Sequence, residues 1–396
     1  MKDIVIIANF CGDFSESDNG RFIYLCKELS KDNTVEIITS DFSHFTKCYK
    51  NKLVNDWPFK ITYLHESGYD KNISLKRLIS HRTWGNSVLK YLRERENPDV
   101  VYCATPSLSA PLKASKYCIE NKIKFIVDIQ DLWPEAFKMV FNVPIMSNII
   151  FSPLKKMADT IYQRANVICG VSESYVNRAL EVSDLDKEHH AVFLGTNLED
   201  FDSFTKNNPI IKKNKDEKWL GYCGSLSSSY DIKCIIDALS ILKNRKKEIP
   251  KFIIMGDGEK KSEFENYANL KGIDTVFTGR LPYDQMCPIL SQCDIVVNPI
   301  TGKSAASIIN KHGDYASAGV PVINTQDSVE YKKLVEKYNM GFNCENSNSK
   351  EVAEKIEILL ANNRLREDMG LNARKCAKEK FDRDYTYKEL IDTILA

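Results

Sequence analysis

The chain has 396 residues, of which 43% are hydrophobic and 28% charged, and its formal net charge at pH 7 is +1. This composition is typical of a soluble globular protein large enough for two domains, and it excludes a chain-wide electrostatic attraction to nucleic acid. The sequence has no apolar run that approaches the roughly eighteen residues needed by a membrane-spanning helix. Its twelve cysteines show no CxxC pair and no Cys/His ligand spacing, so we expect reduced thiols, a cytoplasmic location and no metal site.

Short apolar segments alternate with helical patterns along the whole chain. The first segment, Asp3–Ala8, is too short for the core of a secretory signal and is predicted to be a buried strand. Helices are expected near Arg21–Ser30 and Ile232–Asn244. Because strands separated by helices form parallel sheets with right-handed crossovers, the predicted fold class is α/β. The further expected strands are Thr34–Thr39, Val100–Cys103, Lys124–Ile129, Val167–Val171, Ala191–Leu194, Trp219–Cys223, Lys251–Met255, Thr275–Thr278, Asp294–Asn298 and Val320–Asn324.

One polar segment separates two series of strands and helices. Asp200–Lys218 contains an Asn-Pro pair and a lysine cluster, which is typical of an interdomain linker. We therefore predict a first Rossmann-like domain over residues 1–203 and a second over residues 204–379. Ligands of open parallel sheets bind at the carboxyl ends of the strands, so two such sheets facing one another would enclose a cleft.

The segment Thr301–Asn324 is predicted to form a loop, a helix and a strand. Ser304 or Ser307 can cap this helix, and the free amides at its N-terminus would attract an anion. Lys311 and Asp314 are three residues apart and share a face of the helix. The arrangement suits a diphosphate on the amides and Lys311, with ribose hydroxyls donating to Asp314. An ordinary amphipathic helix with a surface lysine and aspartate is the alternative.

Two segments of the first domain stand where strands are expected to end. Asn9–Arg21 is a long polar loop in place of a glycine-rich turn, which argues against dinucleotide binding. Phe125–Glu135 places Asp131 directly after a buried strand and before a Trp-Pro pair. A carboxylate at this position could orient or deprotonate a hydroxyl group. Alternatively, Asp131 caps the turn that follows.

Two motifs resemble the GT-B glycosyltransferases of family 4, and within them a subgroup that builds bacterial capsule and O-antigen polysaccharides. The motifs are DLWPE at residues 131–135 and the unit of Asn-Lys, Asp-Tyr and AGVPVI within residues 310–323. Asp314 stands at the second of two family glutamates, whereas the first position falls on Ala306. The family places basic residues at Ser225 and near Tyr230. The resemblance therefore leaves Lys311, Arg280 and helix-terminal amides as the groups that could neutralise the diphosphate.

The resemblance implies a GT-B fold in which a C-terminal helix within residues 380–396 crosses back to the first domain. It assigns catalysis to Asp131 on the acceptor side and to Lys311, which would stabilise charge on the leaving diphosphate. Tight turns and a solvated arginine would equally explain the glycines and Arg280. The residues that it implies for sugar-donor binding are Gly20, Arg21, Gly224, Ser225, Gly256, Gly258, Arg280, Leu281, Ser307, Ile308, Lys311 and Asp314.

The implied activity is transfer of a sugar from a UDP- or GDP-sugar to a hydroxyl of a lipid-linked glycan, with retention and without a metal or cofactor. The basic amphipathic segment Lys71–Glu96, which contains Trp84, and the segment Ala136–Ile161 would allow peripheral contact with the cytoplasmic membrane face. A nucleotide-sugar epimerase on the same plan and a non-catalytic GT-B partner subunit are the alternatives. The absence of a glycine-rich turn disfavours a nicotinamide dehydrogenase.

Overall fold

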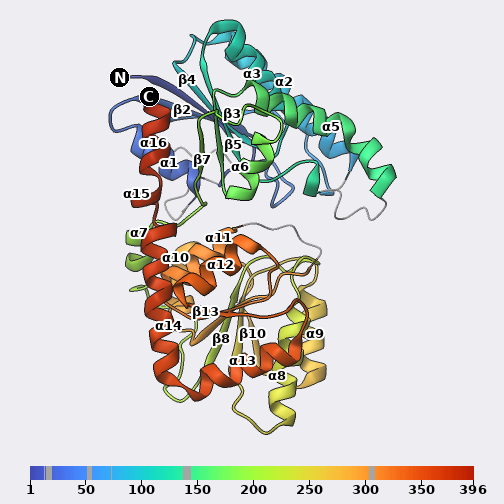
Figure 1. Ribbon diagram of the computed structural model, residues 1–396, viewed down its shortest axis with the longest axis vertical. Helices are drawn as coiled ribbons and strands as arrows, with labels where there is room; N and C mark the ends of the chain where they lie inside the picture. The colour runs from blue at the N-terminus through green and yellow to red at the C-terminus, as the bar shows by residue number, and fades with distance from the viewer. Residues whose placement is uncertain (13, 15–19, 51–55, 73, 137–143, 303–307) are drawn as a thin grey trace. The chain divides into compact units, whose positions relative to one another are not determined.

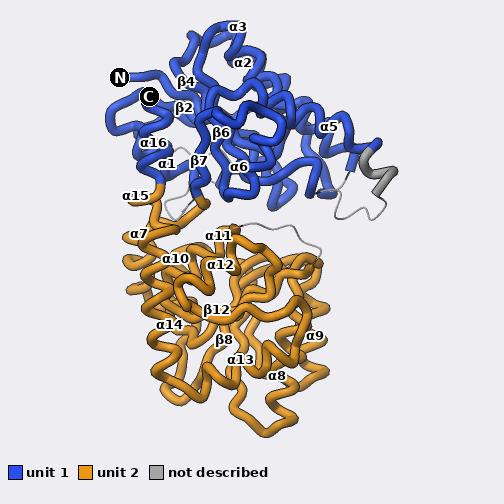
Figure 2. Tube along the Cα trace, viewed as in Figure 1, with its two compact units in different colours: residues 1–192, 387–396 blue, residues 193–386 orange. Residues whose placement is uncertain are grey.

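The structure, a computed structural model, describes the chain except for residues 13, 15–19, 51–55, 73, 137–143 and 303–307. The chain forms two compact units: unit 1 comprises residues 1–192 and 387–396, and unit 2 comprises residues 193–386 (Figure 2). Position 203, where the sequence analysis places the domain boundary, lies inside unit 2. Within the described ranges, no helix is both long enough and apolar enough to cross a membrane.

Unit 1 is a parallel sheet with helices on both faces. Its strands are β1 (Asp3–Ile7), β2 (Thr34–Ser40), β3 (Lys60–Leu64), β4 (Val100–Thr105), β5 (Lys124–Ile129), β6 (Val167–Gly170) and β7 (His189–Ala191). Its helices are α1 (Arg21–Leu29), α2 (Leu75–Glu94), α3 (Ser109–Asn121), α5 (Pro144–Arg164), α6 (Glu173–Leu180) and α16 (Lys388–Leu395). The strand order is β3-β2-β1-β4-β5-β6-β7. Figure 1 labels most of these strands and helices. α1 and α16 share one core with the sheet, whereas α3 packs between α2 and α5.

The burial of each strand explains whether it could be predicted from the sequence. β4 is buried at every position, so it is a continuous apolar run in the sequence. β3, with the sequence KITYL, lies at the edge of the sheet, is partly exposed and was not among the predicted strands. The strand expected at Ala191–Leu194 instead covers His189–Ala191, because its backbone pairs with β6 through Ile168, Cys169 and Gly170.

Unit 2 repeats this architecture with the strand order β10-β9-β8-β11-β12-β13, and all of its paired strands are parallel. Its strands are β8 (Trp219–Cys223), β9 (Lys251–Met255), β10 (Thr275–Phe277), β11 (Ile295–Asn298), β12 (Val322–Asn324) and β13 (Gly341–Asn343). Its helices are α7 (Leu198–Phe204), α8 (Ile232–Asn244), α9 (Lys261–Lys271), α10 (Tyr283–Leu290), α11 (Asn310–Ser317), α12 (Val329–Tyr338), α13 (Ser349–Ala361), α14 (Asn363–Cys376) and α15 (Arg383–Thr386). Two hydrophobic cores line the two faces of the sheet. The α/β prediction is thus confirmed for both units.

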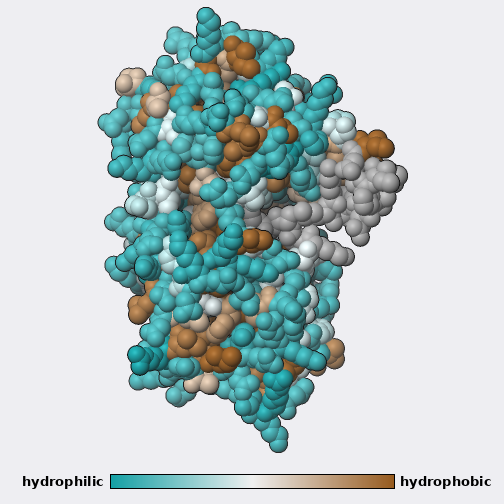
Figure 3. Space-filling view, viewed as in Figure 1, coloured by the Kyte–Doolittle hydropathy of each residue, from teal (hydrophilic) through white to brown (hydrophobic). Residues whose placement is uncertain are grey.

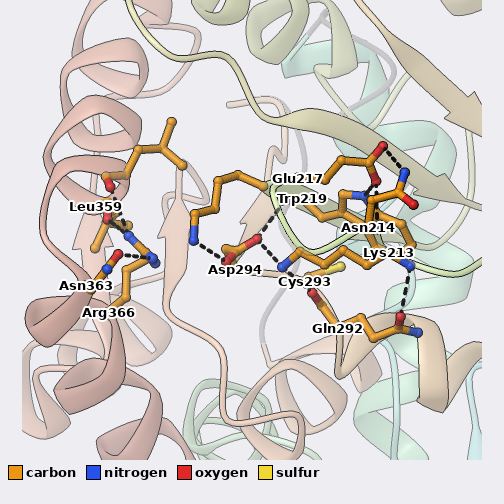
Figure 4. A network of polar contacts seen from close by, with 12 residues as sticks. Lys213, Asn214, Glu217, Trp219, Gln292, Cys293, Asp294, Leu359, Asn363 and Arg366 are labelled. Atoms are coloured by element: carbon orange, nitrogen blue, oxygen red, sulfur yellow. Dashed lines mark hydrogen bonds and ion pairs between the residues drawn. The ribbon is translucent and has the colours of Figure 1, made fainter.

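The segment 200–218, expected to link two domains, lies within unit 2. Its last part is fixed to the amino-terminal edge of the sheet by Asp294 (Figure 4). The Asp294 carboxylate accepts hydrogen bonds from Lys213 Nζ and from the backbone N–H of Trp219, the latter at 2.7 Å. Lys213 Nζ also donates to the Gln292 carbonyl oxygen at 2.9 Å. These contacts make the polar segment part of the domain, and they give Lys213 a structural role.

The helix expected to begin at Ser304 or Ser307 begins at Asn310, with Ile309 as its N-cap residue. Ser304, Ser307 and Ala306 lie outside the described residues. Lys311 is therefore the second residue of α11, and Asp314 stands about one turn from the helix start. The prediction of a longer helix was wrong because the small polar residues before Asn310 carry no signal that distinguishes a helix start from a loop.

Candidate functional site

Two loops of unit 2 interlock at the carboxyl ends of β8 and β9. The Gly224 backbone N–H donates to the Met255 carbonyl oxygen at 3.0 Å. A Cβ atom on Gly256 would lie 1.9 Å from the Gly224 carbonyl oxygen, and one on Gly258 would lie 2.3 Å from the Leu226 carbonyl oxygen. Only glycine fits at these two positions without displacing backbone. The structure thus brings three predicted sugar-donor residues, Gly224, Gly256 and Gly258, into one place.

Lys311 points into the interior of unit 2 beside these loops. Its side chain is 6% exposed, and no described residue hydrogen-bonds its Nζ atom. Nζ lies 4.1 Å from the ring centroid of Tyr222 and 4.0 Å from that of Tyr230. A Cβ atom on Gly224 would lie 2.7 Å from Nζ, so the ammonium group abuts that backbone. Burial lowers the pKa of Lys311 to about 7.

Asp314 lies one turn further along α11, and its carboxyl group faces other elements of unit 2. Its Oδ1 atom accepts hydrogen bonds from Thr196 Oγ1 at 3.0 Å and from the Tyr283 hydroxyl at 2.8 Å. Burial raises the pKa of Asp314 above the usual range of an aspartate, although these two hydrogen bonds oppose the shift. One oxygen, Oδ1, therefore has a structural role in unit 2.

The remaining predicted residues of unit 2 differ in accessibility. Ser225 is exposed, and its carbonyl oxygen accepts a 2.6 Å hydrogen bond from Tyr222. Arg280 is exposed and Leu281 partly buried, and both follow β10 at the carboxyl edge of the sheet. Ile308 is 2% exposed and belongs to a hydrophobic core, so its side chain stabilises the fold. Ser307 lies outside the described residues.

In unit 1, Gly20 is the N-cap residue of α1 and Arg21 its first residue. The Arg21 guanidinium is buried and forms an ion pair with Asp128 at 3.1 Å. It also donates to the Val192 carbonyl oxygen at 2.9 Å and to the Tyr387 hydroxyl at 3.3 Å. The structure therefore directs the Arg21 side chain into the unit 1 core, and it leaves only the α1 backbone for an external anion.

Asp131 follows β5 at the carboxyl edge of the unit 1 sheet. Burial raises the pKa of its carboxyl group to about 6, although hydrogen bonds from the Leu132 backbone and the Trp133 side chain and the nearby Arg77 charge oppose the shift. A carboxyl group with a pKa near neutrality is suited to proton transfer, because it can both accept and release a proton at physiological pH. The neighbouring Glu135 is bound instead by Arg178, at 2.6 Å.

An aromatic and cationic cluster from α2 surrounds the Asp131 turn. The Arg77 guanidinium lies 4.4 Å from the ring centroid of Trp133, and the His81 ring stacks on the same tryptophan with a centroid distance of 5.4 Å. Burial lowers the pKa of His81 to about 3, so its ring is neutral. Among the described side chains, no group of three His, Cys, Asp or Glu residues is arranged to hold a metal ion.

Sequence reasoning missed the side chains that surround the two candidate centres. Tyr230 was noted only as a position without the family's basic residue, and Tyr222, Thr196 and Arg77 were not considered. Each lies far from its partner along the chain, and no local pattern marks it. The one available signal was the alternation of β8, which points Tyr222 to the face opposite Cys223.

The two segments expected to contact a membrane have mixed exposure. Trp84 is fully buried in unit 1, whereas Leu75 and Ile79 on α2 and Ile149 and Ile150 on α5 are exposed. On the face in view in Figure 3, hydrophobic residues form small patches among hydrophilic ones. Trp84 therefore lies on the side of α2 that packs inside its own domain, and the membrane contact expected of this segment would depend on its exposed residues.

A known protein family resembles most of the second half of the chain. Residues 203–376 match the family model described as Glycosyl transferases group 1. Over 238 residues the chain is 24% identical to an uncharacterized glycosyltransferase, MJ1069, of Methanocaldococcus jannaschii. The aligned region covers 59% of this chain and 59% of that protein, so the chain spans about three-fifths of its relative's length.

Solved structures resemble the chain over its whole length. One is Anabaena Alr3699/HepE in complex with UDP, with a TM-score of 0.71, 16% identity and complete coverage of both chains. Another is WaaG, a glycosyltransferase involved in lipopolysaccharide biosynthesis, with a TM-score of 0.68, 13% identity and 99% coverage of both. The likeness confirms the predicted GT-B architecture of two Rossmann-like, parallel-sheet domains.

Proposed function

We propose that the chain is a glycosyltransferase that transfers a sugar from a nucleoside diphosphate donor to a hydroxyl group of an acceptor. One observation carries the proposal: the Lys311 ammonium group is buried without a polar partner among the described residues, beside glycine loops at the carboxyl ends of β8 and β9. Ligands of parallel sheets bind at this edge, and a diphosphate would supply the missing counter-charge. The match of residues 203–376 to the group 1 family supports the same role.

In this proposal unit 2 binds the nucleotide. Lys311 neutralises the diphosphate and stabilises the charge that develops on it as the sugar leaves. Asp314 accepts a ribose hydroxyl through Oδ2, while the backbones of Gly224, Gly256 and Arg280 approach the nucleotide. UDP is bound in the HepE structure that resembles this chain, which favours a uridine nucleotide over a guanosine nucleotide.

Unit 1 supplies the acceptor side. Asp131 orients the acceptor hydroxyl and assists removal of its proton, a role that its raised pKa suits. The reaction proceeds with retention and uses no metal, as the family resemblance implies. The acceptor is a lipid-linked glycan of a surface polysaccharide such as a capsule or O-antigen. The similarity to WaaG supports that class of product, and the exposed apolar residues of α2 and α5 support peripheral contact with the inner face of the membrane.

The test is to incubate the purified chain with UDP- and GDP-sugars, with and without a bacterial lipid extract, and to measure nucleoside diphosphate release. We expect release with a UDP-sugar that depends on the extract. Lys311→Ala should weaken nucleotide binding, by about 1.5–3 kcal/mol as for a charged hydrogen bond. An altered nucleotide sugar formed without extract would instead identify an epimerase. Tight nucleotide binding without turnover on any acceptor would identify a partner subunit.

A further inference from the structure

The position of Lys311 poses an energetic problem that the fold alone does not solve. Burying an ammonium group costs several kcal/mol when no anion pairs with it. Contacts with two aromatic rings return about 1–2 kcal/mol each in a desolvated setting, which is less than this cost. Consistent with that balance, the pKa of Lys311 falls to about 7. The Lys311 side chain is therefore buried without an anionic partner among the described residues.

Hydrogen bonds and ring contacts hold the residues around the Lys311 Nζ atom. The Tyr222 hydroxyl donates to the Ser225 carbonyl oxygen, and the Tyr222 and Tyr230 rings meet edge to face with centroids 5.8 Å apart. The backbone of Tyr230 pairs with Ile300 across an isolated antiparallel bridge. Tyr222 is fully buried whereas Tyr230 is partly exposed, so Tyr230 is the ring that a ligand approaching Nζ would meet first.

No described carboxylate lies within ion-pair distance of Nζ. The titratable groups that face it from the packed elements are Cys223 and Tyr222 at the end of β8, Tyr230 before α8, and Asp314 and His312 on α11. Burial raises the pKa of the Cys223 thiol to about 12, so this group is neutral. Asp314 directs Oδ1 to Thr196 and Tyr283. Among the described residues none supplies the full counter-charge, which a bound anion would provide.

We propose that Tyr222 and Tyr230 are positioning residues that store Lys311 against Gly224, and that the diphosphate of the bound nucleotide displaces the Tyr230 ring and draws a solvent proton onto Lys311. The inference rests on the proposed function, because the ligand is the nucleoside diphosphate. In the proton balance, a neutral lysine amine and one proton from the buffer become an ammonium group that pairs with a phosphate oxygen. Nucleotide binding is therefore coupled to proton uptake.

The size of this coupling follows from the resting state of Lys311. With a pKa of about 7, only about one quarter of the lysine is charged at pH 7.5. A diphosphate that keeps it fully charged requires an uptake of about 0.75 proton per nucleotide. A lysine that merely lies near the site with its ordinary pKa of 10.5 would take up none.

The experiment is calorimetric titration with UDP, and in parallel with GDP, at pH 7.5 in buffers of different ionisation enthalpy. The dependence of the binding enthalpy on the buffer gives the number of protons exchanged. Lys311→Arg keeps the charge permanently and controls for proton release by the phosphate itself. Tyr230→Phe keeps the ring, whereas Tyr230→Leu opens the cage and hydrates Nζ. Tyr267→Leu is a matched control, because that ring also contacts two lysines, at 5.1 and 5.2 Å, outside the site.

We expect wild type, Tyr230→Phe and Tyr267→Leu to take up about 0.75 proton more than Lys311→Arg. Tyr230→Leu should lose this uptake and bind UDP up to about 4-fold more tightly at pH 7.5, because the free protein already carries the proton and no ring has to be displaced. In the ligand-free protein, a ¹³C-methyl-lysine titration should place Lys311 near pH 7 in wild type and well above it in Tyr230→Leu. Equal proton counts in wild type and Lys311→Arg would overturn the inference and leave the proposed function standing. Absence of UDP and GDP binding by wild type would overturn both.

Discussion

Replacing Asp131 by asparagine tests the acceptor side of the site, because the change should affect catalysis and stability in opposite directions. The folded carboxyl group has a pKa of about 6, against 3.8 for an aspartate in an unfolded chain. This difference of about 2 units corresponds to roughly 3 kcal/mol, which we reduce to about 1–3 kcal/mol because the side chain is partly exposed. Asparagine keeps one acceptor oxygen for the hydrogen bonds from Leu132 and Trp133 and carries no charge. Asp131→Asn should therefore stabilise unit 1.

The sign of the pH dependence follows from linkage. Between about pH 4 and pH 6 the unfolded carboxyl group loses its proton before the folded one, so the stability of wild type falls as the pH rises through this window. The gain of Asp131→Asn should be near zero at pH 4 and complete above pH 6. Chemical denaturation at pH 4 and pH 8 measures it, and an equal gain at both values would refute the perturbed pKa.

Catalysis by the same variant should fall at least ~100-fold, the low end for proton transfer by a side chain, with unchanged UDP affinity. In wild type the rate should rise with pH as Asp131 loses its proton, with the midpoint of this limb of the pH–rate profile near pH 6. Arg77→Gln should move the midpoint to higher pH, because the Arg77 charge lowers the pKa of Asp131. Glu135→Gln should move the limb downward, in the opposite direction, because the Glu135 charge raises the pKa of Asp131. Turnover by Asp131→Asn near the wild-type rate would remove this residue from the chemistry.

Three further predictions concern the nucleotide side and the two cores. Asp314→Asn should weaken UDP binding, and this loss of affinity should largely disappear with a 2′,3′-dideoxyribose analogue. A similar loss with both ligands, together with a lower melting temperature, would mean that Asp314 serves only to accept the hydrogen bonds from Thr196 and Tyr283. Gly256→Ala should destabilise unit 2 by at least about 2 kcal/mol and weaken UDP binding, because the new methyl group would clash with the Gly224 carbonyl oxygen. An unchanged thermal unfolding temperature would contradict this clash. Arg21→Met should cost about 3–5 kcal/mol by leaving Asp128 buried without its partner. The Arg21→Met variant should bind UDP with unchanged affinity. A large loss of UDP affinity in a folded variant would indicate that the Arg21 side chain contacts the nucleotide.

The fold was predictable because the information for it is local. Lys124–Ile129, Trp219–Cys223 and Lys251–Met255 are strands with the bounds that their apolar runs suggested. These strands are buried on both faces, so their apolar character is continuous and does not depend on distant partners. β13 was missed because its sequence, Gly-Phe-Asn, has a single apolar side chain and so forms no apolar run. The start of α11 was misplaced because its N-cap residue is Ile309, which has no capping side chain.

The site was less predictable because its properties depend on residues that are distant in sequence. Lys311 was identified as a candidate phosphate ligand, yet the sequence could not show that Tyr222 and Tyr230 enclose it, more than 80 positions away. Arg21 illustrates the converse case. The family resemblance implied that Arg21 lies beside the donor phosphate, but Asp128, Val192 and Tyr387 bind its guanidinium inside the core.

The C-terminal segment has a consequence for how the chain folds while it is being made. Tyr387, Leu390 and Ile394 fill the core of unit 1, whereas unit 2 is one continuous stretch, residues 193–386. During translation unit 2 has all of its residues before unit 1 has its own, which reverses the usual order in which the N-terminal domain folds first. Until Tyr387–Ala396 arrive, the face of the unit 1 sheet beside α1 is uncovered. A nascent chain stalled at residue 386 should therefore expose an apolar surface suited to chaperones.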